Sequence, residues 1–526
     1  MEQLFTFIAD NSSEMLRQTG EHVALTFIAL AIAILAGLPL GILATRFKKL
    51  ETSVLGSVGV IQTIPSIALL GILLPVFGIG VVPAVVALFL YALLPIVRNV
   101  HSGINGVDAS VTEAARGMGM SDNQILTRIE LPLAVPVIFA GIRTATVINV
   151  GVATLCALIG AGGLGEFIFR GIALNNVQMI LAGAVPAALL ALGFDMLLGF
   201  IQKHIKILIK PFYYIAAVLL IVSVPWLFMS IFDSDEQSFR AGMPTEFMER
   251  ADGYKALKQH YGFDIPTMEM NQALMYQAIK NKRVDVIGGY STDGRIDAFN
   301  LKVLHDDNNF FPPYSAAPLV HEETLRQYPE LENALDRLSG LISNEDMIEM
   351  NFRVDEKGEN PKVVAVEFLK EKELRTEKER QGSEDIIVGG KNFTEQFILA
   401  EMFKNVIENY TELAVGTRLG LAGTQIVFGA LINREIDLYP EYTGTGLYVL
   451  LKADSEKAQE LGNSQQQVFE YVKEETKKEF NLVWLDPLGF ENTYAMMMRS
   501  DQANRLGIES ISDLVDYLDN RRVPLR

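Results

Sequence analysis

The sequence predicts a multi-domain protein, with an all-α, six-span transmembrane domain at residues 1–235 followed by an α/β domain at residues 236–526. Apolar stretches long enough to cross a membrane follow one another up to about residue 232. Beyond that point, short β-rich runs alternate with amphipathic helices such as 323–341 and 395–409, which indicates an α/β fold with mostly parallel sheet.

The charge distribution and the composition argue against several kinds of partner and site. The first 235 residues hold 12 basic and 13 acidic side chains, and the remainder holds 33 basic and 50 acidic ones. An acidic soluble part argues against nucleic acid or anionic lipid as its partner, and it is compatible with a cationic ligand. The single cysteine, Cys156, and six histidines without ligand spacing predict no disulfide within the chain, no metal site and no cofactor. Residues 1–21 are polar and amphipathic, so we expect no cleavable signal peptide.

Six apolar segments predict the membrane spans, and basic residues orient them. The segments are 22–45, 54–77, 81–97, 134–159, 177–201 and 212–232. Basic residues follow the first, third and fifth segments: Arg46, Lys48, Lys49, Arg98, Arg116, Arg128, Lys203, Lys206 and Lys210. These loops are therefore expected in the cytoplasm. The N-terminus and everything after residue 232 are expected outside, in a multi-pass protein of the cytoplasmic membrane.

The loop before the fourth segment carries a recognisable pattern, made of Glu113, Ala114, Ala115 and Gly119, then Ile129, Leu131 and Pro132. It resembles the EAA signature of ABC importer permeases. Small residues let a short helix seat deeply, Gly119 can end it in a left-handed conformation, and Pro132 is expected to turn the chain. The resemblance implies that this helix docks on a cytoplasmic ABC ATPase. An interfacial amphipathic helix is the alternative, but the predicted cytoplasmic placement favours docking.

The chain has no G-x-x-x-x-G-K-[ST] motif, so the ATPase is expected to be a separate polypeptide and no catalytic residue is assigned. Two further stretches, Ile61-Gln62-Thr63-Ile64-Pro65-Ser66 and Gly160-Ala161-Gly162-Gly163-Leu164-Gly165, resemble the osmoprotectant branch of these permeases. Proline and glycine at membrane depth mark a translocation path, or, for the glycines, close helix packing. The family also implies a second permease copy, in a homodimer.

Motifs in the α/β part resemble the quaternary-amine substrate-binding proteins for glycine betaine, choline, carnitine and proline betaine. They are residues 388–396 (VGGKNFTEQ), 437–446 (DLYPEYTGTG), 490–495 (FENTYA), 290–294 (YSTDG) and 310–314 (FFPPY). The resemblance implies a two-lobed, periplasmic-binding-protein-like (type II) domain. It also implies an aromatic box of Tyr290, Tyr314, Tyr442 and Tyr494 for a quaternary ammonium, with Gln396 and Thr445 contacting the other end of the ligand.

These motifs do not follow the family's order, because the K-N-F-T-E-Q segment begins only near Ile386, after the segment that starts at Arg240. The order indicates a circular permutation with a charged linker at 370–385. A truncated chain with a missing tail is the alternative. Lobe two is then expected at 239–311 plus 496–526, and lobe one at 312–490, with Arg526 close to residues 239–241. Gly288 and Gly289 stand before Tyr290 where relatives usually have Asp-Ala. The resemblance therefore does not fix the local pocket wall or the choice of ligand.

The resemblances together predict the permease and binding subunit of an ATP-driven importer for a quaternary-amine osmoprotectant. Ergothioneine or another betaine-like solute is an alternative within import, and the sequence does not choose among these solutes. A ligand-gated receptor or channel is the alternative from another class. The EAA loop and the regular spans argue against a channel, which needs a pore loop and no coupling helix.

Overall fold

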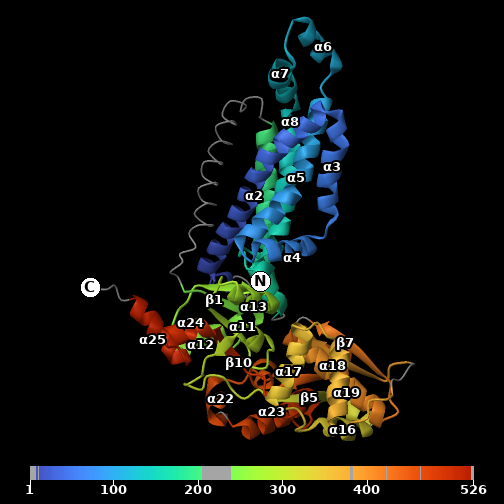
Figure 1. The fold of residues 1–526 in the computed structure, drawn as a ribbon, viewed down its shortest axis with the longest axis vertical. Helices are drawn as coiled ribbons and strands as arrows, with labels where there is room; N and C mark the ends of the chain where they lie inside the picture. The colour runs from blue at the N-terminus through green and yellow to red at the C-terminus, as the bar shows by residue number, and fades with distance from the viewer. Residues whose placement is uncertain are drawn as a thin grey trace. The chain divides into compact units, whose positions relative to one another are not determined.

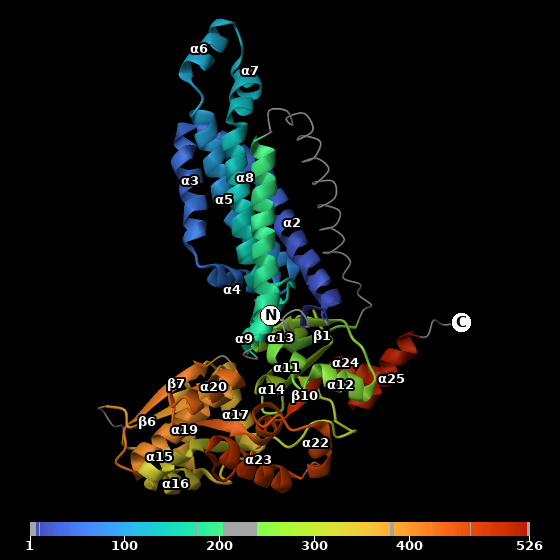
Figure 2. The same cartoon turned by 180° about the vertical axis from the view of Figure 1, so that it is seen from behind.

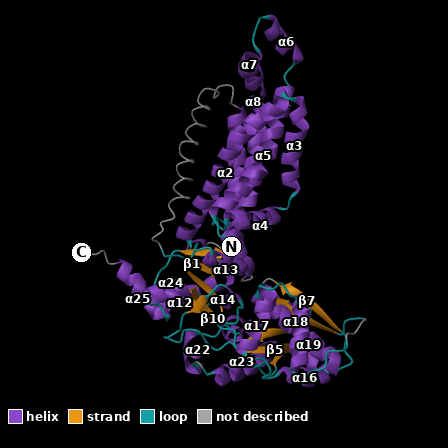
Figure 3. Ribbon diagram, in the orientation of Figure 1, coloured by secondary structure: helices purple, strands orange, loops and turns teal. Residues whose placement is uncertain are grey.

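The structure is a computed structural model that describes residues 7–9, 11–173, 176–203, 239–378, 383–421, 423–462 and 464–522. The chain divides into two compact units, Met1–Gly171 with Val177–Ser238 and Ile172–Asn176 with Phe239–Arg526. We call them the helical unit and the α/β unit. Within the described ranges, every strand belongs to the α/β unit (Figure 3).

Four helices of the helical unit are long and apolar enough to cross a membrane. They are Ser12–Arg46 (α2), Val81–Asn105 (α5), Asp122–Ile159, which includes α8 (Leu131–Ala153), and Val177–Lys203. They coincide with the first, third, fourth and fifth predicted spans, and α2, α5 and α8 run side by side (Figure 1). Glycine permits the close approach of α2 to α5, because a Cβ at Gly41 would lie 2.5 Å from the side chain of Val100. The sixth predicted span, 212–232, falls outside the described residues.

The second predicted span is broken. Residues 54–77 form the end of α3 (Lys48–Thr63) and all of α4 (Ser66–Phe77), which meet at a bend of 100°. The break follows from Pro65, which has no N–H to donate and forces Ile64 into an extended conformation at φ −70° and ψ 126°. The Tyr91 hydroxyl of α5 donates a hydrogen bond to the freed Ile64 carbonyl. The second predicted span is therefore a bent pair of helices and not one straight helix.

The EAA segment forms α6 (Ala109–Gly117), whose first turn is capped by Asp108, with Oδ1 2.9 Å from the N–H of Ser110. Gly119 adopts φ +83° and its N–H donates to the Arg116 carbonyl at 2.9 Å, so the expected left-handed helix end is confirmed. The expected turn at Pro132 is wrong. The chain stays helical through α7 (Asp122–Ile125), a π-helical turn (Leu126–Glu130) and α8, and Pro132 lies in the first turn of α8, directly after the π-helical turn.

The α6–α7 segment and α4 lie at opposite ends of the helical unit (Figure 2). Arg46, at the end of α2, pairs with Glu130, which places the first basic cluster beside the start of α8. At the other end, the N–H of Gly80 donates to the carbonyl of Ile159 at 2.8 Å and the N–H of Gly163 donates to Glu21 at 3.1 Å. The first two loops predicted to be cytoplasmic thus share one end of the unit, and the third, after residue 203, falls outside the described residues.

The α/β unit contains two five-stranded sheets, whose surrounding segments we call lobe two and lobe one. Lobe two has the strand order β2-β1-β3-β10-β4, with β1 Ala241–Pro244, β2 Thr267–Met270, β3 Val286–Tyr290, β4 Leu301–Val303 and β10 Tyr494–Arg499. Lobe one has the order β7-β6-β8-β5-β9, with β5 Ala316–His321, β6 Ile386–Lys391, β7 Val415–Leu421, β8 Leu438–Tyr442 and β9 Leu482–Trp484.

Helices flank both sheets. Those in the lobe-two segments are α11 (Thr245–Glu249), α12 (Tyr254–Tyr261), α13 (Gln272–Lys280), α14 (Arg295–Ala298), α24 (Ser500–Leu506) and α25 (Ile511–Arg522). Those in the lobe-one segment are α15 (Glu322–Gln327), α16 (Glu330–Leu335), α17 (Asn344–Asp355), α18 (Pro361–Glu371), α19 (Thr394–Tyr410), α20 (Thr424–Ile432), α22 (Ser455–Leu461) and α23 (Gln465–Phe480). The predicted helix at 395–409 is α19, whereas the one at 323–341 is interrupted at Pro329.

The prediction of mostly parallel sheet needs correction, because half of the strand pairs are antiparallel. β1 pairs in parallel with β2 and β3, and β6 with β7 and β8, but β10 and β5 are antiparallel to all their neighbours. These two strands directly follow the chain's two crossings between the lobes, the first at residues 312–315 and the second at residues 491–493. The crossings contact each other, since the N–H of Asn492 donates to the carbonyl of Tyr314 at 3.1 Å.

Candidate functional site

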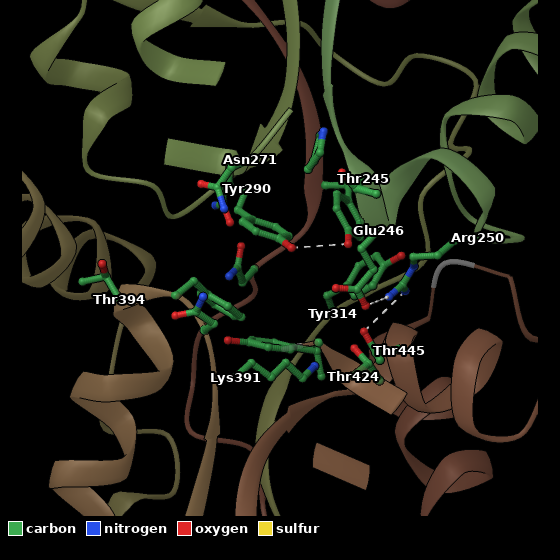
Figure 4. Close-up of a pocket in the computed structure, with 18 of the residues that line it drawn as sticks. Thr245, Glu246, Arg250, Asn271, Tyr290, Tyr314, Lys391, Thr394, Thr424 and Thr445 are labelled. Carbon is green, nitrogen blue, oxygen red and sulfur yellow. Dashed lines mark hydrogen bonds and ion pairs between the residues drawn. The ribbon is translucent and has the colours of Figure 1, made fainter. Parts of the chain in front are cut away.

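Four tyrosines line one cavity of about 390 Å³ between the lobes (Figure 4). Tyr290 ends β3 and Tyr494 begins β10, and the antiparallel register places them opposite each other, with ring centroids 4.9 Å apart. Tyr314 lies in the first crossing, 5.9 Å from the Tyr494 ring in an edge-to-face arrangement. Tyr442 ends β8 of lobe one. The four tyrosines that the sequence singled out are thus brought together by strand ends and a crossing.

A fifth ring completes this wall and was not predicted. Phe393 lines the cavity between Tyr290 and Tyr442, and its centroid lies 5.5 Å from the first and 6.4 Å from the second. It immediately precedes α19, in the same motif that supplied Gln396. That position at the carboxyl end of a central strand was the available signal. Phe247 supports the wall from behind, stacked on Tyr494 at 4.4 Å.

Three cationic side chains also line the cavity, Lys391, Arg250 and Arg295, and sequence reasoning missed all of them. The Lys391 ammonium lies 2.6 Å from Glu441 and 5.3 Å from the Tyr442 centroid. The Arg250 guanidinium is held by Asp252 through two hydrogen bonds of 2.8 and 2.6 Å, and its Cζ lies 5.2 Å from the Tyr494 centroid. Both carboxylates are buried and neither is among the cavity-lining residues. The cavity therefore presents the Lys391 and Arg250 cations with buried carboxylates behind them. Two further carboxylates, Glu246 and Asp355, line the cavity and lie 3.6 Å from Arg250 and Arg295.

The two predicted polar contacts have different positions. Thr445 lines the cavity, and its hydroxyl accepts a 3.4 Å hydrogen bond from Arg250 of the opposite lobe. Gln396 does not line it. The Gln396 side chain is fully buried and donates to the Tyr442 hydroxyl at 3.1 Å and to the Pro440 carbonyl at 2.9 Å. The geometry makes Gln396 a support for the Tyr442 ring.

The family comparisons agree with this architecture. Residues 230–371 and 384–525 match the model of the substrate binding domain of ABC-type glycine betaine transport systems. The chain belongs to this family. Residues 37–210 match the model of the binding-protein-dependent transport system inner membrane component, so a permease domain precedes the substrate-binding domain in one chain.

Similar proteins match the permease part. The glycine betaine/carnitine/choline transport system permease protein OpuCB of Bacillus subtilis (strain 168) is 43% identical over 205 residues, which cover 39% of this chain and 94% of that protein. The osmoprotectant import permease protein OsmW of Salmonella typhimurium is 47% identical over 201 residues, covering 37% and 94%. A solved glycine betaine/carnitine/choline ABC transporter structure aligns at 43% identity over 26% of this chain and 52% of its own, with a TM-score of 0.22.

The two glycines that replace Asp-Ala lie behind the wall of the binding cavity. A Cβ at Gly288 would lie 2.6 Å from the sulfur of Met243 and 3.1 Å from the ring of Phe247. A Cβ at Gly289 would lie 2.5 Å from the Tyr276 hydroxyl. Gly288 thus makes room for Phe247, the ring that stacks on Tyr494, so this departure from the family pattern acts through wall packing.

Burial sets the ionisation of the cavity rings. It raises the pKa of Tyr290, Tyr314, Tyr442 and Tyr494 above the ordinary value for a phenol. At neutral pH the four rings are therefore uncharged and offer neutral π-faces to a ligand. Such faces attract a cation that cannot donate hydrogen bonds, at about 0.5–2 kcal/mol per ring.

The predicted coupling residues are accessible in part. Glu113 and Ala114 are exposed on α6 and Ala115 is buried against the segment, while Gly119 is exposed beyond it. Met118 next to Gly119 is 75% exposed. This small protruding helix with an apolar tip suits docking into a partner's cleft.

Proposed function

We propose that the chain is the permease and binding subunit of an ATP-driven importer whose solute carries both a quaternary ammonium and a carboxylate, as glycine betaine does. The carrying observation is the cavity itself, with neutral aromatic faces beside Lys391 and Arg250, each of which is paired with a buried carboxylate. A quaternary ammonium fits the rings, and a carboxylate fits Lys391 and Arg250 through charge-assisted hydrogen bonds. Carnitine and proline betaine share both groups, whereas choline lacks the carboxylate.

Ergothioneine, also a betaine, is a second candidate because it offers the same two groups. A ligand-gated channel remains the alternative from another class. The match to the inner membrane component family and the capped, exposed α6 favour import over the channel. The relatives named above transport glycine betaine, carnitine, choline or osmoprotectants by their names, which supports the same solute class here.

We also infer the assembly around this chain. A separate cytoplasmic ATPase docks on α6 at Glu113, Ala114, Ala115 and Gly119, and two permease copies form the pore with six spans each. Residues after 232 then lie outside the membrane. The gathering of the first two basic loops at the α6 end supports this orientation. Protease added to spheroplasts should release the substrate-binding domain, and full protection would refute the orientation.

The circular permutation is part of the proposal. Two separate segments match the family model, and in this structure they complete both sheets together, with β10 between β3 and β4. The ring of Phe239 lies 5.6 Å from that of Tyr517 on α25, so the two ends of the domain pack together. Arg526 and the tether at 233–238 lie outside the described residues. The linker packs on lobe one, where the N–H of Lys378 donates to Asn409 at 2.9 Å.

Calorimetry of the full chain in detergent tests the solute class. We expect glycine betaine and carnitine to bind, and choline to bind roughly 10-fold or more weakly, because bonds to charged groups contribute about 1.5–3 kcal/mol. Tighter binding of choline would refute the carboxylate subsite. Binding of ergothioneine far above the others would select the second candidate, and binding of no quaternary amine would refute the proposal.

A further inference from the structure

A buried carboxylate outside the cavity wall joins both lobes. Glu395, on the first turn of α19, is 2% exposed and accepts four hydrogen bonds. Its Oε1 accepts from the Tyr442 hydroxyl at 2.5 Å and from the Asn492 amide at 2.9 Å. Its Oε2 accepts from the Thr292 hydroxyl at 2.6 Å and from the Asn351 amide at 3.2 Å. Four donors saturate both oxygens, which is the geometry of an ionised carboxylate.

The four donors come from different parts of the domain. Tyr442 is a wall ring of lobe one, Thr292 lies in the turn after β3 of lobe two, and Asn492 lies in the second crossing. Asn351 lies on α17 and also donates to the Thr292 carbonyl at 2.8 Å. The carboxylate is thus bonded at one oxygen to the cavity ring and the second crossing, and at the other to Thr292 of the opposite lobe and Asn351 of its own lobe.

The turn that carries Thr292 contacts lobe one closely, as a second observation shows. A Cβ at Gly294 would lie 2.2 Å from the backbone nitrogen of Phe352 on α17. Beside it, Arg295 pairs with Asp293 at 2.5 Å and with Asp355 of α17 at 3.6 Å. Only glycine permits this approach, because backbone atoms cannot move aside as a flexible side chain can. Thr292 therefore reaches Glu395 only when the lobes are in contact.

We infer that Glu395 is a positioning residue that couples contact between the lobes to the orientation of the Tyr442 ring, and thereby slows ligand release. The inference rests on the proposed function. When the lobes separate, Oε2 loses the Thr292 donor and the Glu395 carboxylate is left to the Asn351, Asn492 and Tyr442 donors alone. When they close, Thr292 adds the fourth donor, which fixes the carboxylate more firmly, and the Tyr442 hydroxyl is held by a short charge-assisted bond. The Glu395 carboxylate then holds both the Tyr442 ring, which faces the ligand, and Thr292 of the opposite lobe.

The test is the dissociation rate of radiolabelled glycine betaine from the full chain in nanodiscs. Thr292→Val removes the lobe-two donor without touching the cavity, and we expect a roughly 10- to 100-fold faster release with a little-changed association rate. Glu395→Gln should act similarly, and Thr292→Val should add little in the Glu395→Gln background, because both interrupt one connection. Tyr442→Phe keeps the ring and removes the hydroxyl that donates to Glu395 and accepts from Gln396, so it should also speed release.

Glu408→Gln is the matched control on the same helix. Glu408 is also 2% exposed, and it accepts from the N–H of Val415 within lobe one at 3.2 Å. It is expected to lower the unfolding temperature without changing the release rate. If wild type binds glycine betaine and Thr292→Val and Tyr442→Phe both release it at the wild-type rate, the inference fails while the proposed function stands. If wild type binds no quaternary amine, the proposed function fails. The two single-donor variants keep the test decisive if Glu395→Gln does not fold.

Discussion

Lys391 and Glu441 form a buried ion pair, with Nζ 2.6 Å from Oε1, beside the ring of Tyr442. The Glu441 carboxylate also accepts from the Tyr439 hydroxyl at 2.9 Å and from the N–H of Tyr442 at 2.8 Å. The anion is therefore fixed in place, and the ammonium is presented toward the cavity from one side. A ligand carboxylate could share that ammonium without displacing its partner.

The first prediction follows from this arrangement. Lys391→Met should weaken glycine betaine binding by about 10-fold or more, because a charge-assisted bond to the ligand carboxylate is lost. Choline, which has no carboxylate, should lose much less, so the ratio of the two affinities measured by calorimetry is the informative quantity. Lys457→Met is the control, since Lys457 forms a surface pair with Glu460 at 2.9 Å. Equal loss for both solutes would show that Lys391 only maintains the fold.

The second prediction distinguishes the contribution of the Tyr290 ring to ligand affinity from that of its hydroxyl. The Tyr290 hydroxyl makes only a long contact of 3.4 Å with the Tyr494 hydroxyl. Tyr290→Phe should therefore bind a quaternary ammonium almost as wild type does. Tyr290→Leu should lose one π-face, which corresponds to roughly 2- to 30-fold in affinity for about 0.5–2 kcal/mol. Tyr410→Leu removes a ring that Arg337 covers at 4.0 Å outside the cavity, and it should leave affinity unchanged.

Much of this site could be predicted from local sequence. The four tyrosines lie at strand ends and in a crossing within short motifs, so matching the motifs was enough to bring them together. Lys391 and Arg250 were missed because their role depends on Glu441 and Asp252, which become partners only in the folded domain. Gln396 was misplaced for the same reason, since its burial behind Tyr442 is decided by packing and not by its position in a motif.

In the fold, too, features set by local sequence were predicted and features set by the path of the chain were missed. Hydropathy located the spans, because their length and apolar character are local properties. It did not predict the break in the second span, where Pro65 ends a helix in an apolar run that continues on both sides. The even mix of parallel and antiparallel pairs was also missed. It arises because β5 and β10 enter their sheets from the crossings, a feature of chain path that strand propensity does not encode.

The third prediction concerns Gly119 on the coupling segment. A Cβ there would meet nothing within 4 Å, so bulk is excluded only by a docked partner, while φ +83° penalises any other residue by about 1 kcal/mol. Gly119→Trp should abolish solute uptake and co-purification of the ATPase from native membranes, yet leave ligand affinity unchanged. Gly119→Ala carries the same backbone strain without the bulk and should retain part of the uptake. Loss of ligand affinity in either variant would contradict a role confined to coupling.

The fourth prediction uses the pKa of Glu395. Burial raises this pKa above the ordinary glutamate value, and the four hydrogen bonds offset the effect only in part. Because the folded state then binds the proton more tightly than the unfolded state, stability should fall as pH rises from the unfolded pKa through the folded one. The neighbouring donors are neutral, but burial also raises the pKa of Asp355, which pairs with Arg295, so wild type alone is not diagnostic.

The measurement therefore compares the pH dependence of stability in wild type with that in a Glu395→Gln variant. Thermal unfolding of the full chain in detergent should be followed from pH 4 to 7 in wild type and in Glu395→Gln. The glutamine variant cannot titrate at this position, so wild type should lose stability relative to it as pH rises. A gap that stays constant, or that moves the other way, would mean that the Glu395 carboxylate is not held with a raised pKa.

The last prediction tests the permutation by undoing it. A soluble chain that runs from residue 384 to 522, continues through a short glycine-serine linker, and then runs from 239 to 378 restores the family order. Its new junction joins segments that already pack together, since Phe239 and Tyr517 have ring centroids 5.6 Å apart. Its new ends lie where the chain is anchored on lobe one, by Lys378 to Asn409 and by the N–H of Asp385 to the carbonyl of Ala414 at 2.8 Å. Termini that lie close together on a surface tolerate such rearrangement.

The rearranged domain should be monomeric and should bind glycine betaine within a few-fold of the natural order. A control opened between Met402 and Phe403, inside the buried helix α19, should fail to fold because it interrupts that helix among fully buried side chains. A rearranged domain that folds only as a dimer would instead indicate that the two segments are exchanged between subunits.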